Sequence, residues 1–280
     1  MKTSFLDFLF FLRTQNCLKE TTCLEYAHLA MRLRRPLRSE LSLKKYCLVK
    51  QKSGLQPETL NKYLKVARWW CLYSHQDWYK NLKKFRCFPQ HKATLTIAEV
   101  HDFINLHTSA VLDAFWLLHI FSGTRPSEVA RLRFQDLDLD NCCFYPAQTK
   151  TNDGKPIMVY QWVIQRLQTY LATQPGPYLF SYAAGQRPLS LRTVQKDCQR
   201  RLRLLHCPKR ITPHSFRHTF ATIGIASGQV PVQYMQRLLR HHRITTTMHY
   251  FDQSVDFMRE AALAHPYAQF WQPNYCHSHF

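Results

Sequence analysis

Residues 211–222 read ITPHSFRHTFAT, and this stretch decides how the second half of the chain is interpreted. Thr212 and Pro213 open a predicted helix. His214 and Arg217 lie three residues apart, so they project from the same face of that helix within its first turns. Both side chains donate hydrogen bonds, and together they suit one phosphate group.

A rival interpretation pairs His214 with His218, four residues further on, as zinc ligands. Zinc hydrolases with this spacing carry a glutamate between the histidines as the base, whereas the residues here are Ser, Phe and Arg. A fixed cation between two ligands also repels the metal. We therefore expect no metal site and interpret His218 as a buried, hydrogen-bonded histidine.

Upstream, residues 122–140 read SGTRPSEVARLRFQDLDLD. Pro126 fits the first position of a helix, Glu128 suits its first turn, and Arg125 lies at its mouth. An arginine beside the exposed N–H groups of a helix start is a candidate phosphate site. The alternative is a simple helix cap in which Arg125 makes a surface ion pair, and this stretch alone leaves both open.

Between these two stretches, the run DLDLDNCCFYPAQTK (136–150), the turn TNDG and the run KPIMVYQ (155–161) predict an antiparallel hairpin. Lys150 and Lys155 flank its turn. Lysines near turns are usually only solvated, although one at a loop tip can reach into a substrate groove.

Downstream, residues 238–253 read LLRHHRITTTMHYFDQ. Composition alone permits a metal site, a nucleic-acid contact or a nucleophile here. His241, His242 and His249 have no nearby acidic or cysteine ligand except Asp252, which argues against metal. Tyr250 would ordinarily be a packing residue.

The charge of the whole chain points to a polyanionic partner. Lys and Arg number 38 against 18 Asp and Glu, which gives a net charge of +20 and a pI near 9.7. Residues 1–92 hold 19 of the basic residues but only 6 of the acidic ones. The first third is therefore the stronger electrostatic clamp.

The fold class predicted is mainly α, or α+β, in two domains. Helical spacing of apolar residues covers 1–87, residues 88–94 form a linker, and 95–280 form a larger helical domain with a small antiparallel sheet. Pro57 is expected in the first turn of a helix, and Thr96 with Glu99 predict a capping box.

Three cations three residues apart lie on one face of the helix predicted after Pro57: Lys62, Lys65 and Arg68. A solvated face is the usual meaning of such a stripe, but the surrounding charge favours contact with DNA. The scattered cysteines, the absence of a signal sequence and the lack of an apolar run of membrane length predict a cytoplasmic protein with reduced thiols and no membrane contact.

Taken in order, GTRPSEVARL, TKTNDGK, HSFRHTFAT and LLRHHRITTTMHY resemble the tyrosine recombinase, or phage integrase, family. The resemblance covers the second half of the chain. The first half is similar only in its helical, basic character, which matches that family's SAM-like core-binding domain. The residues at matching positions are Arg125, Lys150, His214, Arg217, His241 and Tyr250.

The resemblance implies a site-specific enzyme that integrates, excises or resolves DNA without cofactor or metal. Tyr250 is the nucleophile that forms a 3′-phosphotyrosyl bond, and Arg125 and Arg217 stabilise the phosphate. Lys150 protonates the leaving 5′-oxygen, with Lys155 as a weaker rival. His214 assists proton transfer, and His241 donates a hydrogen bond to the phosphate.

The family usually has glycine before His241, whereas this chain has Arg240, which is expected to contact DNA. The implied partner is double-stranded DNA, bound by a tetramer of two dimers on paired sites, with a monomer or weak oligomer free of DNA. The location implied is the cytoplasm, at the nucleoid. Helical residues 252–271 either pass to a neighbouring subunit or fold back. Alternatives are a type IB topoisomerase, a DNA-binding protein without catalysis and a zinc nuclease.

Overall fold

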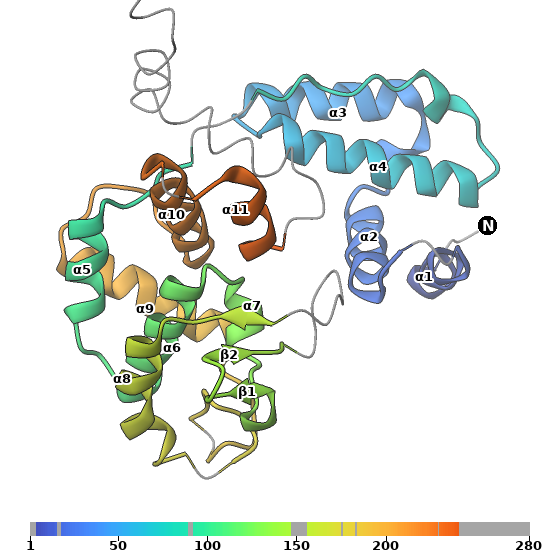
Figure 1. Cartoon of the computed structure of the whole chain (residues 1–280). Helices are drawn as coiled ribbons and strands as arrows, with labels where there is room; N and C mark the ends of the chain where they lie inside the picture. The colour runs from blue at the N-terminus through green and yellow to red at the C-terminus, as the bar shows by residue number, and fades with distance from the viewer. Residues whose placement is uncertain are drawn as a thin grey trace, which may run out of the picture. The chain divides into compact units, whose positions relative to one another are not determined.

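The computed structural model describes residues 4–15, 18–88, 92–146, 156–174, 176–182, 184–228 and 230–240. The chain divides into two compact units, Met1–Gln90 and His91–Phe280, and the division falls inside the segment predicted as the linker (Figure 1). The predicted fold class is confirmed, because the structure is mainly helical with one small antiparallel sheet.

The first unit is helical over the segments that the apolar spacing predicts. Its elements are α1 (Phe5–Thr14), α2 (Glu20–Arg32), η1 (Pro36–Arg38), α3 (Glu40–Lys52), α4 (Pro57–Tyr73) and η2 (Trp78–Asn81). Pro57 begins α4, as predicted. Phe8 is fully buried and packs edge-on against Trp70, with 5.1 Å between the ring centroids, so α1 is held against α4.

The second unit is built around α6, which is apolar on nearly every face, as a fully buried helix must be. Its helices are α5 (Ile97–Asn105), α6 (Ala110–Ser122), α7 (Pro126–Val129), α8 (Gln161–Leu171), α9 (Leu191–Leu204), α10 (Pro213–Ala226) and α11 (Val232–Leu238). Helix α6 contacts α5, α7, α8 and α10. The capping box of Thr96 and Glu99 at the start of α5 is confirmed.

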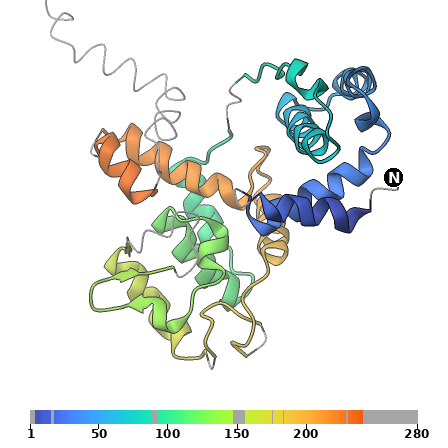
Figure 2. The same ribbon diagram turned by 90° about the vertical axis from the view of Figure 1, so that its right-hand side faces the viewer.

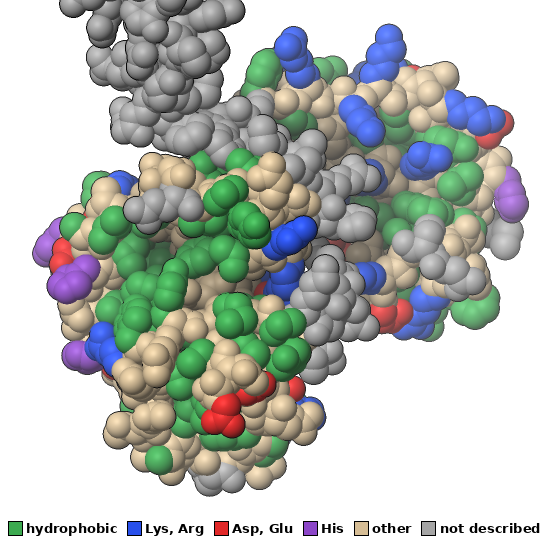
Figure 3. All heavy atoms as spheres, in the orientation of Figure 1, with side chains coloured by type: hydrophobic (Ala, Val, Ile, Leu, Met, Phe, Trp, Pro, Cys, Tyr) green, Lys and Arg blue, Asp and Glu red, His purple; other side chains and the backbone are tan. Residues whose placement is uncertain are grey.

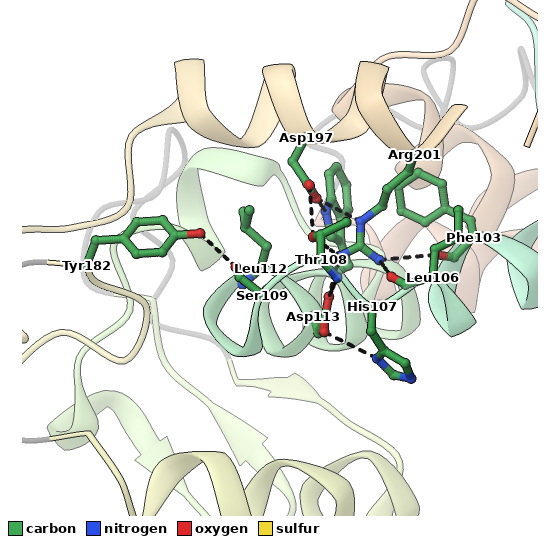
Figure 4. Close-up of polar contacts among 11 residues, drawn as sticks. Phe103, Leu106, His107, Thr108, Ser109, Leu112, Asp113, Tyr182, Asp197 and Arg201 are labelled. Atoms are coloured by element: carbon green, nitrogen blue, oxygen red, sulfur yellow. Dashed lines mark hydrogen bonds and ion pairs between the residues drawn. The ribbon is translucent and has the colours of Figure 1, made fainter. Parts of the chain in front are cut away.

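A buried polar network joins α9 to the loop between α5 and α6 (Figure 4). The guanidinium of Arg201 is completely buried and donates to Asp197 at 2.7 Å and to the Thr108 hydroxyl at 2.8 Å. It also pairs with Asp113. Asp197 in turn accepts from the indole of Trp116 at 2.8 Å. Because each charge has its partners, this burial is tolerated and holds the helices around α6 in place.

The sheet has three strands in the described residues, β1 (Leu137–Asp138), β2 (Cys143–Phe144) and β3 (Ile157–Met158), in the antiparallel order β1-β2-β3. The sequence predicts two runs around one turn, and the pairing of β2 with β3 agrees with this. The first run is itself folded into two strands, because Asp138 accepts from the Asn141 backbone at 3.0 Å and Cys142 adopts a φ of 48°.

Helix α11 packs against α10 through an apolar cluster in which Ala221 and Ile225 contact Met235 and Leu239. Figure 2 shows the two helices, in orange, side by side. The end of α11 is therefore held close to the residues that α10 carries. None of the helices in the described ranges has the length and apolar character needed to cross a bilayer.

Candidate active site

The turn between α6 and α7 positions the first arginine of the site. Gly123 ends α6 with a φ of 61°, and a Cβ there would lie 2.4 Å from the ring of Phe220. Glycine meets both demands, because it adopts this conformation without strain and leaves room for the ring. The chain then turns through the buried Thr124 to Arg125, and Pro126 begins α7 as predicted.

Arg125 is held by Glu128, one turn further along the chain. Its Nη1 donates to Glu128 Oε1 at 2.8 Å, and its backbone N–H donates to Oε2 at 2.9 Å. The Glu128 side chain is 2% exposed, whereas that of Arg125 is 23% exposed. The ion pair expected for a simple helix cap is therefore present. Its carboxylate is buried rather than at the surface, and part of the Arg125 guanidinium remains exposed.

Arg217 lies in the second turn of α10 and is 2% exposed. Its Nη1 donates to the carbonyl oxygen of Gly123 at 2.9 Å, and its Nη2 donates to that of Leu239. The guanidinium therefore ties three segments together: the turn before Arg125, α10, and the end of α11. The guanidinium is a permanent cation, and these two acceptors are neutral carbonyl groups.

His214 lies at the start of α10 and is exposed. Its pKa is lowered to about 4, first because neighbouring groups remove water from part of the ring and second because cations surround it. Those cations are Arg217, Lys92 and Arg125. The structure thus brings Arg125, His214 and Arg217 into one electrostatic neighbourhood, where the imidazole is neutral near pH 7 and able to accept a proton.

His218 is buried, as predicted, and its ring meets that of His214 edge-on with 4.8 Å between the centroids. Its Nε2 lies 3.3 Å from the ammonium of Lys92. Within the described ranges no group of three or more His, Cys, Asp or Glu side chains is placed to hold a metal ion. Lys92 was missed in the sequence because it lies in a segment that has no periodicity.

His119 is a second histidine that the sequence conceals, because it lies within the apolar run of α6. Its Nε2 donates to the carbonyl oxygen of Pro213 at 2.8 Å, next to His214. Complete burial lowers the pKa of His119 to about 4. The ring is therefore neutral and ties the buried centre of α6 to the start of α10.

Arg240 directly follows the end of α11, and its side chain is 3% exposed. Its Nη2 lies 2.6 Å from Glu128 Oε2, so the carboxylate that holds Arg125 also holds Arg240. The side chain of Arg240 therefore points toward Glu128. Its predicted contact with DNA stays a prediction, as do the roles of Lys150, His241 and Tyr250, which lie outside the described residues.

The three cations predicted to contact DNA from α4 differ in exposure and in pairing. Lys65 and Arg68 are exposed, and the guanidinium of Arg68 lies 5.9 Å from the ring centre of Tyr79. Lys62 is partly buried and pairs with Glu25. Figure 3 shows lysine and arginine side chains over the first unit on the face drawn. Two of the three cations are therefore exposed, and their contact with DNA stays a prediction.

A second group of cations, which the sequence reasoning missed, surrounds a surface hollow between α2 and α3. Its basic lining residues are all exposed: Arg32, Arg34, Arg35 and Lys45. The run RLRRPLR (32–38) was the available signal. A turn of charged residues is usually only solvated, so this run alone does not predict a binding surface.

Comparison with known proteins identifies the class to which this site belongs. Residues 94–256 match the model of the phage integrase family, so the chain belongs to that family and the predicted resemblance is confirmed. Tyrosine recombinase XerA of Pyrococcus horikoshii is 26% identical over 222 residues, which cover 75% of each chain. Tyrosine recombinase XerC of Chlamydia pneumoniae is 27% identical over 196 residues, covering 68% of this chain and 61% of the relative.

Solved structures with a similar fold include the Tn1549 transposon integrase in complex with circular intermediate DNA. That structure has a TM-score of 0.73 at 19% identity and covers 93% of this chain and 99% of its own. A lambda integrase dimer bound to a COC′ core site gives a TM-score of 0.71 at 16% identity, covering 90% and 77%. The chain is thus an enzyme of the tyrosine recombinase class, which transfers DNA strands.

Proposed function

We propose that this chain cuts and rejoins DNA at specific sites through a 3′-phosphotyrosyl intermediate. The hydroxyl oxygen of Tyr250 loses its proton and attacks the phosphorus of a phosphodiester, while the bond from phosphorus to the 5′-oxygen breaks. The leaving 5′-oxygen takes up a proton and becomes a free hydroxyl. Attack by the 5′-hydroxyl of another strand reverses these steps and rejoins the DNA, so no external energy source is needed.

Arg125 and Arg217 stabilise the charge that builds on the two non-bridging oxygens of the phosphate. A guanidinium suits this task because it is permanently charged and presents several N–H groups in one plane. His241 adds a hydrogen bond to the same phosphate in this proposal. The exposed edge of Arg125 and the carbonyl-bound Arg217 support the assignment.

Two residues take part in proton transfer, one as the acceptor and one as the donor. The hydroxyl of tyrosine has a pKa of about 10, so it needs a base during attack, and neutral His214 assists that transfer. Lys150 supplies the proton to the leaving 5′-oxygen, with Lys155 as the weaker candidate. The place of His214 supports its part, because its ring lies beside Arg217 and Arg125, and the loss of water together with their charges lowers its pKa to about 4, so the ring is neutral near pH 7.

One observation carries the proposal: Arg125, His214 and Arg217, which are spread over 93 residues of sequence, meet around the α6–α7 turn. Arg217 donates to Gly123, two residues before Arg125, and both arginines act on the pKa of His214. A helix cap that was merely structural would not require the other two residues at this place. The proposal therefore rests on convergence rather than on any single motif.

The substrate in this proposal is double-stranded DNA, and the first unit supplies many of the basic side chains that bind its phosphate groups. Lys65 and Arg68 on α4 contact the phosphate backbone, and the basic hollow between α2 and α3 offers a second contact area. Lys62 joins them once phosphate replaces Glu25.

The active assembly we propose is a tetramer of two dimers on paired DNA sites, formed from monomers or weak oligomers. Strand exchange between two duplexes needs four tyrosines, because two strands are cut in each duplex. Residues 252–271, which lie outside the described part of the chain, are the candidate for the contact between subunits, with folding back onto their own subunit as the alternative. The enzyme acts in the cytoplasm, at the nucleoid, where its substrate lies.

A test on supercoiled DNA in the presence of EDTA separates the proposal from its rivals. Recombination between two cognate sites without metal supports it. Relaxation without any exchange of partners favours a type IB topoisomerase, and cleavage that EDTA abolishes favours a zinc nuclease. Tight binding without strand breakage would indicate a DNA-binding protein that lacks catalysis.

A further inference from the structure

Arg240 combines two unfavourable features at one position. Its φ is 50°, in the left-handed region that favours glycine and costs other residues roughly 1 kcal/mol. Its side chain is 3% exposed, although arginine is rarely buried without a partner. Strained and buried polar residues of this kind concentrate at functional sites, which directs attention to the groups that Arg240 contacts.

The partner of Arg240 is Glu128, and that carboxylate is shared. Glu128 Oε2 accepts from Arg240 Nη2 at 2.6 Å and from the backbone of Arg125 at 2.9 Å, while Oε1 accepts from Arg125 Nη1 at 2.8 Å. Both oxygens are therefore occupied, and the plane of the carboxylate has little freedom to rotate. The orientation of Arg125 depends on this plane.

The sharing also changes the charge balance. Glu128 is almost fully buried, so its interaction with each cation is only weakly screened. One negative charge divided between two arginines leaves Arg125 less completely neutralised than a private ion pair would. Arg240 Nη1 is buried and has no hydrogen-bond partner among the residues that the structure describes. The pair of cations therefore keeps net positive charge where the phosphate is expected.

A hydrogen bond from Arg217 also holds the end of α11 in place. The carbonyl oxygen of Leu239, the residue before Arg240, accepts from Arg217 Nη2. Two consecutive residues at the end of α11 thus contact the arginine sites: Leu239 through its backbone and Arg240 through Glu128. The geometry holds the end of α11 against both sides of the α6–α7 turn.

We propose that Arg240 is a positioning residue for strand cleavage. Through Glu128 it holds the guanidinium of Arg125 in the orientation that the scissile phosphate requires, and it ties the end of α11 to α7. This inference rests on the proposed function, since it concerns the arginine that stabilises the phosphate. It differs from a direct DNA contact because its effect requires Glu128.

The test measures single-turnover cleavage of a cognate suicide substrate, dissociation constants for uncleaved DNA and melting temperatures. Arg240→Gly removes the side chain while suiting the left-handed backbone, so relief of the backbone offsets part of the stability lost with the buried ion pair. Cleavage is expected to slow about tenfold or more, with DNA affinity within about twofold, because misorientation of a catalytic group acts on the reaction step. Arg240→Lys, which keeps one donor for Glu128, is expected to recover part of the rate.

Three further variants test whether Arg240 acts through Glu128. Arg237→Ala removes an exposed cation from the same helix and is expected to leave the rate unchanged. Glu128→Gln is expected to slow cleavage by itself. The double variant Glu128→Gln with Arg240→Gly is expected to cleave no more slowly than Glu128→Gln alone, because both changes break the same connection between Arg240 and Arg125.

The inference is overturned if Arg240→Gly cleaves at the parent rate, or if the fall in rate of the double variant equals the product of the two single falls. The second outcome would assign Arg240 to phosphate contact alone. If the unaltered chain forms no covalent adduct with DNA, the proposed function fails and the inference fails with it. An active parent together with an unaffected Arg240→Gly variant overturns the inference alone.

Discussion

The guanidinium of Arg217 donates a 2.9 Å hydrogen bond to the carbonyl oxygen of Gly123, joining the second turn of α10 to the turn that presents Arg125. Gly123 holds a left-handed conformation there, and its missing side chain makes room for Phe220. Through this hydrogen bond the two arginines are placed by a single local structure. Damage to it is therefore expected to affect both catalysis and folding.

Arg217→Lys tests the role of the guanidinium. Lysine keeps a positive charge and three N–H donors, but these diverge from one nitrogen and do not reproduce the planar fork that reaches two carbonyl groups and a phosphate. Cleavage is expected to fall by about 100-fold or more, as when one donor to a developing charge is removed. Unfolding is expected to become easier by about 1–3 kcal/mol, because buried carbonyl groups are left without donors.

The measurements for Arg217→Lys are single-turnover cleavage, DNA affinity and thermal unfolding. DNA affinity is expected to stay within about twofold, since the other basic side chains still bind phosphate groups. Arg192→Lys makes the same exchange at an exposed position of α9 and is the control. Cleavage by Arg217→Lys close to that of the control would mean that Arg217 is only a structural tie.

DNA binding by α4 is tested by replacing Lys65 and Arg68 together with alanine. Removing one cation that binds a phosphate is expected to lower the slope of log affinity against log salt by about 1, so the slope of the double variant should fall by about 2. Lys44 and Lys80, also exposed but paired with Glu40 and Asp77, provide a control double variant with the same change of charge. Equal slopes for both variants would mean that Lys65 and Arg68 do not contact the DNA.

The pH dependence of stability is expected to reflect His119. Its pKa is about 4 in the folded chain against 6.5 ordinarily, so the unfolded chain takes up the proton first as pH falls. This contribution to stability is complete above pH 6.5 and disappears as the pH falls through 6.5 toward 4. Between pH 7.5 and 5 the decrease from this group is about 2 kcal/mol.

His119→Gln removes this titration while retaining a donor for the Pro213 carbonyl. The free energy of unfolding in urea, measured at pH 7.5 and pH 5, should therefore fall less in the variant than in the parent. His214 titrates in both proteins, so the difference between them isolates His119. Identical falls would show that His119 is not held neutral by burial.

Local signals in the sequence were sufficient for most helices of the described chain. The capping box at Thr96 and Glu99 and the prolines that begin α4 and α7 all act within a few residues, and all are confirmed. The extra strand was missed because it depends on one Asp–Asn turn and a left-handed Cys142.

The order of its motifs predicted the candidate site, but it did not predict the hydrogen bonds within that site. Glu128 was expected only as a helix-start residue, and its bond to Arg240 crosses 112 positions. The ion pair between the buried Arg201 and Asp113 spans 88 positions, so local sequence patterns do not predict it either. Such pairings depend on which helix faces meet around α6, and helical periodicity does not specify this.

The most direct test of the central claim is a covalent adduct between Tyr250 and DNA. A cognate duplex nicked just beyond the cleavage site releases its 5′-hydroxyl fragment, so rejoining is prevented and the intermediate accumulates. Incubated in EDTA and separated under denaturing conditions, the unaltered chain is expected to migrate with a covalently bound 3′-ended strand. Tyr250→Phe should bind the same DNA and form no adduct. An adduct of equal yield in Tyr250→Phe, or none from the unaltered chain on its cognate site, would contradict the account.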